Sequence, residues 1–347
     1  MRALYAKKLG GDSPLANLEF GERPDPVPGP GQVRVRVRCA TLNHHDYWTL
    51  KGVVGHPVTP PRILGCDASG SVDSYGSQRP DGAPEPGSEV AVYPVTFCGA
   101  CPACRGGDPM LCRSFYMLSD GPIDGSFAEF LIAPAHNVVP KPASLSHEET
   151  ACLGTTYLTA YRMLFSKANV KPGDRVLVQG AGGGLATAAI SLAAAAGATV
   201  IASSRSEEKL SRARRIGAHA GVLAGKDAAK RILSLTGGEG VDAVIESVGE
   251  PTWATSLRAV RPGGTVVVAG ATAGPNPPAD LARIFWRQIR ILGSTEGTLA
   301  EFNALIRFVE RAQIKPAIDT VYRFDQALTA FERLASGDFF GKLVLKM

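Results

Sequence analysis

Four cysteines in one short segment constrain this chain more than any other feature of its sequence. Cys98, Cys101, Cys104 and Cys112 stand in FCGACPACRGGDPMLC, with the spacing C-x2-C-x2-C-x7-C. Two-residue gaps turn consecutive thiolates inward on a tight loop, and the longer gap returns the fourth to close a tetrahedron. Zn²⁺ prefers that geometry at ~2.3 Å per sulfur, and an all-cysteine shell has no open position for substrate. The spacing therefore predicts a single structural zinc.

Disulfides or free thiols are the alternative for these cysteines. Neighbours three residues apart in a tight loop bridge poorly. The N-terminal sequence MRALYAKKLGGDSPLANLEF lacks an apolar stretch followed by a small-residue cleavage site, and no segment resembles a membrane span. We therefore expect a cytoplasmic protein without a membrane partner, in which thiolates stay reduced. Two further cysteines, Cys39 and Cys152, are expected in the core.

Length and charge narrow the class of protein. With 347 residues, of which 45% are hydrophobic, the chain can form two globular domains with separate cores. The net charge of +5 is mild and spread out. Arg34, Arg36 and Arg38 alternate with valines, which is typical of the solvent face of a strand. We expect a small-molecule substrate and no nucleic-acid partner.

The pattern of secondary structure changes near residue 150. Before it, short β runs such as QVRVRVRCA and EVAVYPV are separated by segments rich in glycine and proline. Ser146 and Glu149 then form an S-x-x-E capping box, which predicts a helix running through TYLTAYRML. From Asp174 onward, apolar strands alternate with helices, which predicts an α/β domain with a parallel sheet covered on both faces.

The tail ends in GKLVLKM and returns to β character. We expect it to rejoin the first domain, so that the α/β domain is an insertion. The predicted division is 1–150 with 296–347 for the β-rich domain, and 151–295 for the α/β domain.

A glycine cluster lies between the first strand and the first helix of the α/β domain. The segment QGAGGGLATAA places Gly180, Gly182, Gly183 and Gly184 there. Without side chains, the backbone N–H groups and the helix N-terminus can approach a pyrophosphate. Glycines at this point of a βαβ unit predict a dinucleotide-binding loop, and the alternative is a merely flexible turn.

The end of the second strand distinguishes NAD from NADP. NAD-binding proteins usually place Asp or Glu there to hold the ribose 2′-hydroxyl. This chain has IASSRSEEK, with hydroxyls and cations in place of the acid: Ser203, Ser204, Arg205 and Lys209. These groups suit a 2′-phosphate, so we predict NADPH. Alternatively, Arg205 and Lys209 are solvated residues at a helix start.

Together these segments resemble the medium-chain dehydrogenase/reductase superfamily over essentially the whole chain. The markers are the cysteine lobe, GSFAEF, TYLTAYRML, KPGDRVLVQGAGGG, RPGGTVVVAG and GKLVL. The resemblance implies a GroES-like catalytic domain, a Rossmann domain with a doubly wound parallel sheet, a nicotinamide cofactor, and a homodimer or homotetramer. It also implies further cofactor contacts at His44, Thr159, Leu185, Val248 and Gly270.

Zinc alcohol dehydrogenases of this superfamily hold a second, catalytic zinc. The resemblance places its three ligand positions at Asn43 in LNHHD, Cys66 in LGCD, and Thr155 four residues before Thr159. An amide and an un-ionised hydroxyl are poor Zn²⁺ ligands. We therefore expect no catalytic zinc. Asn at the first position is also found in the quinone-reductase and enoyl-reductase branches.

A reductase without a metal still needs a proton donor. The mitochondrial enoyl-thioester reductases use a tyrosine at the position that Val54 occupies here, so the chain departs from that subgroup. We predict catalytic roles for Asn43, His45 and Tyr47, with His45 as the leading proton donor because its ordinary pKa suits proton transfer near neutrality. The alternative for His45 is a hydrogen-bonded structural role or a contact with the cofactor. Asp46 is expected to be structural, and Cys66 is either a buried thiol or a reactive one.

The sequence thus predicts an NADPH-dependent reductase of quinones or α,β-unsaturated carbonyls, because such substrates disperse negative charge without a Lewis acid. One alternative is an NADP(H)-dependent alcohol dehydrogenase or carbonyl reductase that keeps a catalytic metal. Another is a non-catalytic protein that binds NADPH as a sensor.

Overall fold

The computed structural model describes residues 1–53, 58–77 and 79–347, so Val54 lies outside the described residues. The chain forms two compact units. The first consists of Met1–Thr156 and Thr298–Met347, and the second of Tyr157–Gly297. The second unit is therefore an insertion in the first, with its boundaries after residues 156 and 297 where the sequence suggested 150 and 295.

Antiparallel strands dominate the first unit. Its largest sheet has seven strands in the order β10-β6-β5-β3-β18-β17, with β9 also paired to β3. A three-stranded sheet, β2-β1-β4, and the ribbon β7-β8 complete it. The strands are β1 (Arg2–Ala6), β2 (Leu18–Glu22), β3 (Gln32–Thr41), β4 (Arg62–Ile63), β5 (Asp67–Tyr75), β6 (Glu89–Val92), β7 (Val95–Thr96), β8 (Tyr116–Met117), β9 (Phe130–Pro134), β10 (Val138–Pro140), β17 (Ile318–Arg323) and β18 (Lys342–Lys346).

Short helices connect these strands. The α-helices of this unit are α1 (His44–Leu50), α2 (Pro102–Arg105), α3 (His147–Ala151), α10 (Leu299–Arg311) and α11 (Ala327–Ser336). Ser146 caps α3 through the predicted box with Glu149. The chain then continues as a π-helical segment, Leu153–Tyr157, which carries Thr155. The helix predicted through TYLTAYRML is therefore present, with π-helical turns on both sides of α4 (Leu158–Tyr161).

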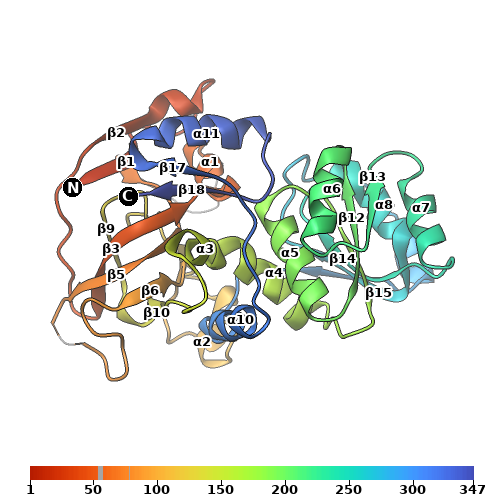
Figure 1. Ribbon diagram of the computed structural model, residues 1–347, viewed down its shortest axis with the longest axis horizontal. Helices are drawn as coiled ribbons and strands as arrows, with labels where there is room; N and C mark the ends of the chain where they lie inside the picture. The colour runs from red at the N-terminus through yellow and green to blue at the C-terminus, as the bar shows by residue number, and fades with distance from the viewer. Residues whose placement is uncertain (54–57, 78) are drawn as a thin grey trace. The chain divides into compact units, whose positions relative to one another are not determined.

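The strand β3 shows the predicted alternation. Its valines are buried in the core, while Arg34 and Arg36 face Asp73 at 2.6 and 3.6 Å. The C-terminal strand β18 pairs antiparallel with β3, Val344 opposite Thr41, so the last strand of the chain joins the sheet of the N-terminal part (Figure 1). This pairing brings Lys342 beside the end of β3.

The second unit is a six-stranded parallel sheet with helices between its strands. The strand order is β13-β12-β11-β14-β15-β16, and each neighbouring pair is parallel. The strands are β11 (Arg175–Val178), β12 (Thr199–Ser204), β13 (Ala220–Leu223), β14 (Val241–Glu246), β15 (Val260–Val268) and β16 (Arg290–Gly293). The helices after α4 are α5 (Gly184–Ala195), α6 (Glu207–Arg215), α7 (Ala228–Leu235), α8 (Glu250–Ala259) and α9 (Leu281–Trp286).

This strand order reverses direction between β11 and β14. Ligands of doubly wound sheets bind outside the carboxyl ends of the strands at such a switch point. The glycine cluster follows β11, so it lies at that place. The predicted fold, a GroES-like domain with a doubly wound Rossmann domain, is confirmed.

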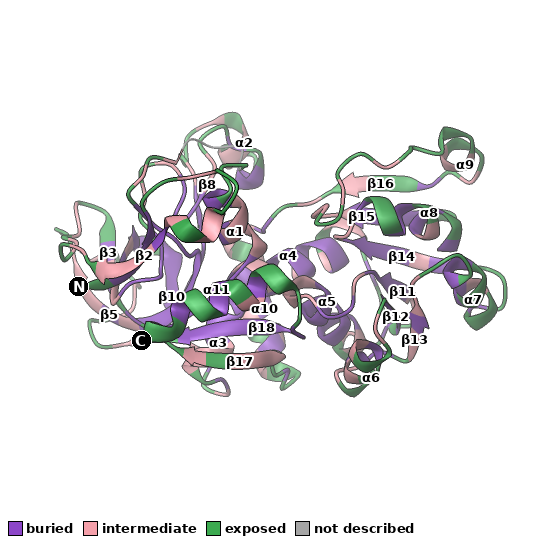
Figure 2. Ribbon diagram, turned by 90° about the horizontal axis from the view of Figure 1, so that it is seen from above, coloured by how far each residue is buried: buried purple, intermediate pink, exposed green. Residues whose placement is uncertain are grey.

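Burial differs along the parallel sheet. The central strands β11, β12 and β14 are almost wholly buried, as expected for a sheet covered on both faces. The edge strand β16 is mostly exposed, as is α9 before it (Figure 2). Within the described residues, no helix is long and apolar enough to span a bilayer.

Candidate active site and cofactor loop

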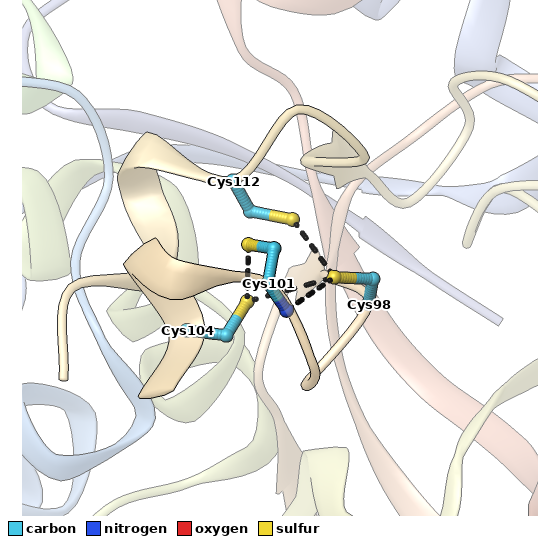
Figure 3. A group of neighbouring side chains, drawn as sticks. All are labelled: Cys98, Cys101, Cys104 and Cys112. Carbon is cyan, nitrogen blue, oxygen red and sulfur yellow. Dashed lines mark hydrogen bonds between the residues drawn. The ribbon is translucent and has the colours of Figure 1, made fainter. Parts of the chain in front are cut away.

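The four cysteines of the lobe come together as the spacing predicts (Figure 3). Their ligand atoms lie within 4.8 Å of one another, with Cys98–Cys112 and Cys101–Cys104 sulfur distances of 3.5 Å and a Cys98–Cys104 distance of 3.9 Å. A tetrahedron with ~2.3 Å bonds has edges of about 3.8 Å. All seven cysteines of the chain are unbridged. The donor set therefore fits Zn²⁺ and not a pair of disulfides.

Backbone groups prepare this site for thiolates. The N–H of Cys101 lies 3.4 Å from the Cys98 sulfur, and the N–H of Ser114 lies 3.3 Å from the Cys112 sulfur. Backbone hydrogen bonds at Ala100 and Cys101 lower the pKa of the Cys98 thiol to about 6. Thiolates are the form that binds zinc. A zinc held here would serve the lobe's structure, since its four positions are all taken by protein.

A second polar centre is built around the carboxylate of Asp67, at the start of β5. The side chain is fully buried. Its Oδ2 accepts hydrogen bonds from the Thr41 hydroxyl and the Asn43 amide, each at 2.8 Å. Its Oδ1 accepts from the backbone N–H and the hydroxyl of Thr155 at 2.7 and 2.8 Å. The approach is close: a Cβ at Gly154 would lie 2.3 Å from Oδ1. Glycine at 154 therefore makes room for the carboxylate.

Lys342 supplies the positive charge at this centre. Its Nζ donates to the Leu42 carbonyl at 2.9 Å and to Asn43 Oδ1 at 2.5 Å, and lies 3.5 Å from Asp67 Oδ2. Only 2% of the side chain is exposed. Buried charges are tolerated when they are paired and hydrogen-bonded in this way. The lysine also fixes the orientation of the Asn43 amide, because it occupies the amide oxygen.

The three positions traced to the catalytic zinc ligands meet at this centre. Asn43 Nδ2 and Thr155 Oγ1 lie 3.5 and 3.4 Å from the sulfur of Cys66. The amide oxygen of Asn43 accepts a hydrogen bond from Lys342, and the amide nitrogen of Asn43 is a hydrogen-bond donor to Asp67. The Thr155 hydroxyl also donates to Asp67. Only the sulfur remains as a ligand atom, so these residues do not fit a catalytic zinc. In the described part of the chain, the four-cysteine lobe is the one cluster of His, Cys, Asp or Glu side chains suited to a metal.

The first turn of α1 carries the other predicted catalytic residues. His45 Nε2 lies 3.1 Å from Asp120 Oδ1, a partner that the sequence did not indicate. Tyr47 is partly buried against the core, with the Lys51 ammonium 5.4 Å from its ring centre. Asp46 is buried and accepts the backbone N–H of Asn43 at 2.7 Å, in a structural role that agrees with the sequence interpretation. Burial raises the pKa of Asp46 to about 7.

The adjacent His44 has a different environment. Its ring lies near those of Trp48 and Phe339, with centroids 6.0 and 6.5 Å apart. Burial lowers the pKa of His44, and the charge of Lys342 lowers it further. The ring is therefore neutral near pH 7. Its predicted contact with the cofactor remains a prediction.

In the second unit, the glycine loop has the conformation that glycine permits. Gly180 and Gly182 have φ of +71° and +137°, and α5 starts at Gly184 with Gly183 as its N-cap. A Cβ at Gly180 would meet the side chain of Val248 at 2.7 Å, so the loop packs closely against the segment after β14. These backbone N–H groups at a helix start suit a pyrophosphate. Leu185, in the first turn of α5, is half-buried.

The end of β12 carries no carboxylate. Ser203 and Ser204 are its last residues, and Arg205, which follows, is exposed. The stem of Lys209 lies over the loop, with its Cδ 2.7 Å from a Cβ built at Gly182. Cations thus stand at the strand end and over the glycine loop.

Three more predicted cofactor residues lie in the same unit. Thr159 is a buried residue of α4. Gly270 lies just after β15, against the Ser247 carbonyl. The segment containing Val248 is held by Glu246, a buried residue not predicted from sequence, whose Oε1 accepts the N–H groups of Val248 and Gly249 at 2.8 and 3.2 Å. All three lie in segments that follow or precede strands of the parallel sheet.

A sheet with this switch point and this glycine loop is typical of a dinucleotide-binding domain. Residues 29–143 match the alcohol dehydrogenase GroES-like domain, and residues 184–311 match the zinc-binding dehydrogenase family. The chain belongs to the medium-chain dehydrogenase/reductase superfamily. It is an enzyme of the oxidoreductase class that uses a nicotinamide cofactor.

Relatives with several activities align with most of the chain. A zinc-type alcohol dehydrogenase-like protein of Schizosaccharomyces pombe is 32% identical over 318 residues, 89% of each chain. A crotonyl-CoA carboxylase/reductase of Cereibacter sphaeroides is 32% identical over 85% of this chain and 75% of its own. A quinone oxidoreductase of Rattus norvegicus is 30% identical over 78% and 82%.

Solved structures agree with this assignment. A crystal structure of an NAD-dependent alcohol dehydrogenase superposes with a TM-score of 0.93 at 38% identity and covers both chains fully. The crotonyl-CoA carboxylase/reductase AntE, in complex with NADP, has a TM-score of 0.90 at 27% identity, covering 100% of this chain and 95% of its own.

Replacing Lys342 tests the buried ion pair. The Lys342→Met variant leaves the Asp67 carboxylate buried without its cation, so we expect the free energy of unfolding to fall by about 3–5 kcal/mol. Urea unfolding measures the change. Lys346→Met is the matched control on the same strand, because Lys346 pairs with Glu148 at the surface, and it should leave stability nearly unchanged. Equal losses in both variants would contradict the role of the pair.

Proposed function

We propose that this enzyme is an NADPH-dependent reductase that transfers hydride to a quinone or to a carbon–carbon double bond conjugated to a carbonyl, without a catalytic zinc. The proposal rests on the hydrogen-bonded centre of Asn43, Cys66 and Thr155. There the Asn43 amide and the Thr155 hydroxyl form hydrogen bonds with Asp67 and Lys342 and do not present ligand atoms to a metal. An isolated carbonyl is harder to polarise for hydride transfer without a Lewis acid, whereas a conjugated acceptor spreads the charge over several atoms.

The chemistry of an enone fits the residues present. The nicotinamide, when bound, supplies hydride. As hydride reaches the β carbon, the electron pair of the C=C bond moves toward the carbonyl oxygen and gives an enolate. The second N–H of the Asn43 amide faces only weak acceptors, the Cys66 sulfur and the Thr41 carbonyl at 3.5 Å, so it remains available to that oxygen. A proton delivered to the α carbon, from His45 in this proposal, completes the reduction. For Tyr47 we propose a supporting role near this site and no proton transfer.

Relatives support this reading of the reaction. Three of the similar proteins reported above are named for crotonyl-CoA reduction or as a quinone oxidoreductase. Others are named alcohol dehydrogenases. The site supports the first group, because alcohol oxidation by zinc enzymes needs a catalytic ligand set that Asn43, Cys66 and Thr155 do not provide.

A substrate survey tests the function. With NADPH, the protein should reduce enones or quinones and should not oxidise simple alcohols with NADP⁺, because the site has no metal to hold an alkoxide. Steady-state rates for one enone, one ortho-quinone and one primary alcohol measure this. Brisk, metal-dependent alcohol oxidation with no enone or quinone turnover would refute the proposal, and so would the absence of turnover with all three.

The choice of NADPH rests on the end of β12. Ser203, Ser204, Arg205 and Lys209 replace the acid that holds the ribose of NAD, and no carboxylate at that strand end repels a 2′-phosphate.

The variant Arg205→Ala tests this choice. We expect it to weaken NADPH binding by about 1.5–3 kcal/mol, since a charge-assisted contact is lost, and to leave NADH binding nearly unchanged. Calorimetric titration with both nucleotides measures it. Arg215→Ala, an exposed change at the far end of α6, is the control and should affect neither. Equal wild-type affinity for NADH and NADPH would contradict the prediction.

The four-cysteine lobe gives a second cofactor, one structural zinc per chain. We expect elemental analysis of chelator-washed protein to return one zinc, because this is the one cluster with suitable ligands among residues 1–53, 58–77 and 79–347. A reducing compartment such as the cytoplasm would preserve it. Cys104→Ser should lose the zinc and lower the melting temperature, while nucleotide still binds the other unit. Cys39→Ser, at a buried cysteine outside the lobe, should keep the metal. Zero or two zinc ions per wild-type chain would contradict this assignment.

The edge of the parallel sheet supports a homodimer. Strand β16 has an unpaired edge, and three of its four residues are exposed. Large apolar side chains are exposed beside it, with exposed fractions of 69% for Leu281, 68% for Phe285 and 81% for Trp286. A second copy related by a two-fold axis can pair the same edge with itself and cover these side chains.

Light scattering after size exclusion tests this assembly. The wild-type protein should elute as a dimer or a dimer of dimers, and Trp286→Glu should yield smaller species because a charge is placed in the apolar contact. Val27→Glu changes an equally exposed residue of the first unit and should leave the mass unchanged. A monomeric wild-type protein would contradict the proposal.

A further inference from the structure

The structure contains a buried carboxylate, Asp120, whose one side-chain partner among the described residues is a histidine of the candidate site. Asp120 Oδ1 lies 3.1 Å from His45 Nε2, and the two side chains are 2% and 17% exposed. No other described side chain contacts the Asp120 carboxylate within hydrogen-bonding distance. A buried carboxylate with a single partner is favoured when that partner carries positive charge.

The backbone around Asp120 is fixed. Its N–H donates to the Met117 carbonyl at 3.0 Å, and its own carbonyl accepts from Ile123 at 3.1 Å. The preceding residue, Ser119, has φ of +80°, a conformation that non-glycine residues rarely adopt. Backbone strain of this kind persists only where the surroundings enforce it. The turn therefore holds the carboxylate at a set position against α1.

The charged groups acting on His45 come from three elements. Asp120 acts from the turn after β8, Asp46 from α1 itself, and Asp67 from β5. Burial opposes a charged ring, but the hydrogen bond and charge of Asp120, with the two other carboxylates, raise the pKa of His45 above its ordinary value. The other ring nitrogen, Nδ1, has no hydrogen bond to any described residue.

We propose that Asp120 is the positioning residue for proton transfer: it holds His45 Nε2 and keeps the ring protonated, so that Nδ1–H faces the substrate as the proton source. This inference rests on the proposed function. In the reaction, the Nδ1–H bond breaks and a C–H bond forms at the α carbon of the enolate. The imidazole is left neutral, still donating Nε2–H to Asp120, and regains its proton from water.

A second pairing of a histidine with a carboxylate in the first unit, His147 with Glu89, has no ring nitrogen left to face a substrate. His147 lies between Ser69 Oγ at 2.9 Å and Glu89 Oε1 at 3.2 Å, so both ring nitrogens are engaged. The buried Ser69 hydroxyl donates to the Val90 carbonyl, which leaves it no proton to give His147. Burial lowers the pKa of His147. This histidine anchors α3, and it provides a matched control.

The variant Asp120→Asn keeps the shape of the contact and removes the charge. The rate of enone reduction at saturating NADPH should fall as the pH rises, because the protonated ring is the active form. In the variant we expect this fall at a pH about one unit or more below that of the wild type. The NADPH dissociation constant should be unchanged. Quinone reduction should change less than about threefold, since a quinone oxygen collects its proton from water. Glu89→Gln, the same change beside His147, should leave the enone profile unchanged.

A titration of His45 itself keeps the test independent of turnover. Imidazole ¹⁵N shifts of the free protein, assigned with His45→Gln, should show His45 losing its proton at lower pH in Asp120→Asn than in wild type. His45→Gln should slow enone reduction by about 10²–10⁴-fold, and adding Asp120→Asn to it should cost little more. If the melting temperature shows that Asp120→Asn does not fold, the test rests on the His45→Gln variant alone.

The outcomes separate this inference from the proposed function. An unchanged His45 titration and enone profile in Asp120→Asn, with normal wild-type enone turnover, would overturn the role of Asp120 and leave the function intact. Full enone activity in His45→Gln would overturn the proton source. A wild-type protein that reduces no enone would overturn the proposed function, and the catalytic part of this inference with it.

Discussion

The Asp67 carboxylate is the interaction on which the first unit's site depends. Four separate segments reach it: the end of β3 through Thr41, the start of α1 through Asn43, the π-helical segment through Thr155, and the C-terminal strand through Lys342. Burying a charge costs several kcal/mol, and only its complete set of partners offsets that cost. The same contacts that satisfy the carboxylate therefore fix the geometry of all four segments at once.

This arrangement also decides what chemistry the site can perform. Lys342 donates a hydrogen bond to the oxygen of Asn43, so the amide can offer only its N–H groups to a substrate. The Thr155 hydroxyl donates its proton to Asp67. A site of hydrogen-bond donors stabilises negative charge that develops on a substrate oxygen, but it polarises a ground-state carbonyl less than a metal does. Acceptors that disperse charge by conjugation match such a site. Among the described residues the one cluster suited to a metal is the cysteine lobe, where a zinc ion would have no open position.

Local patterns in the sequence predicted the features that are local in the structure. The cysteine spacing, the glycine loop after β11 and the serines at the end of β12 each depend on residues within one loop or turn. The fold followed from strands and helices in alternation. What the sequence did not show were pairings between distant segments: Lys342 with Asp67, 275 residues apart, and His45 with Asp120, 75 apart. Single-sequence patterns carry no signal for such contacts, because each partner is unremarkable in its own segment.

The two adjacent histidines of α1 show most clearly what a single sequence cannot predict. His44 and His45 are identical in type and adjacent in sequence, and both were candidates for the site. Burial and Lys342 lower the pKa of His44, while Asp120 and the other carboxylates raise that of His45. These shifts favour the neutral form of His44 and the protonated form of His45, and the protonated form is the one that can act as an acid. The difference comes from the burial of each ring and from the charges that it faces, so the fold gives two adjacent residues of the same type opposite pKa shifts, and the one whose pKa is raised is the proposed proton donor.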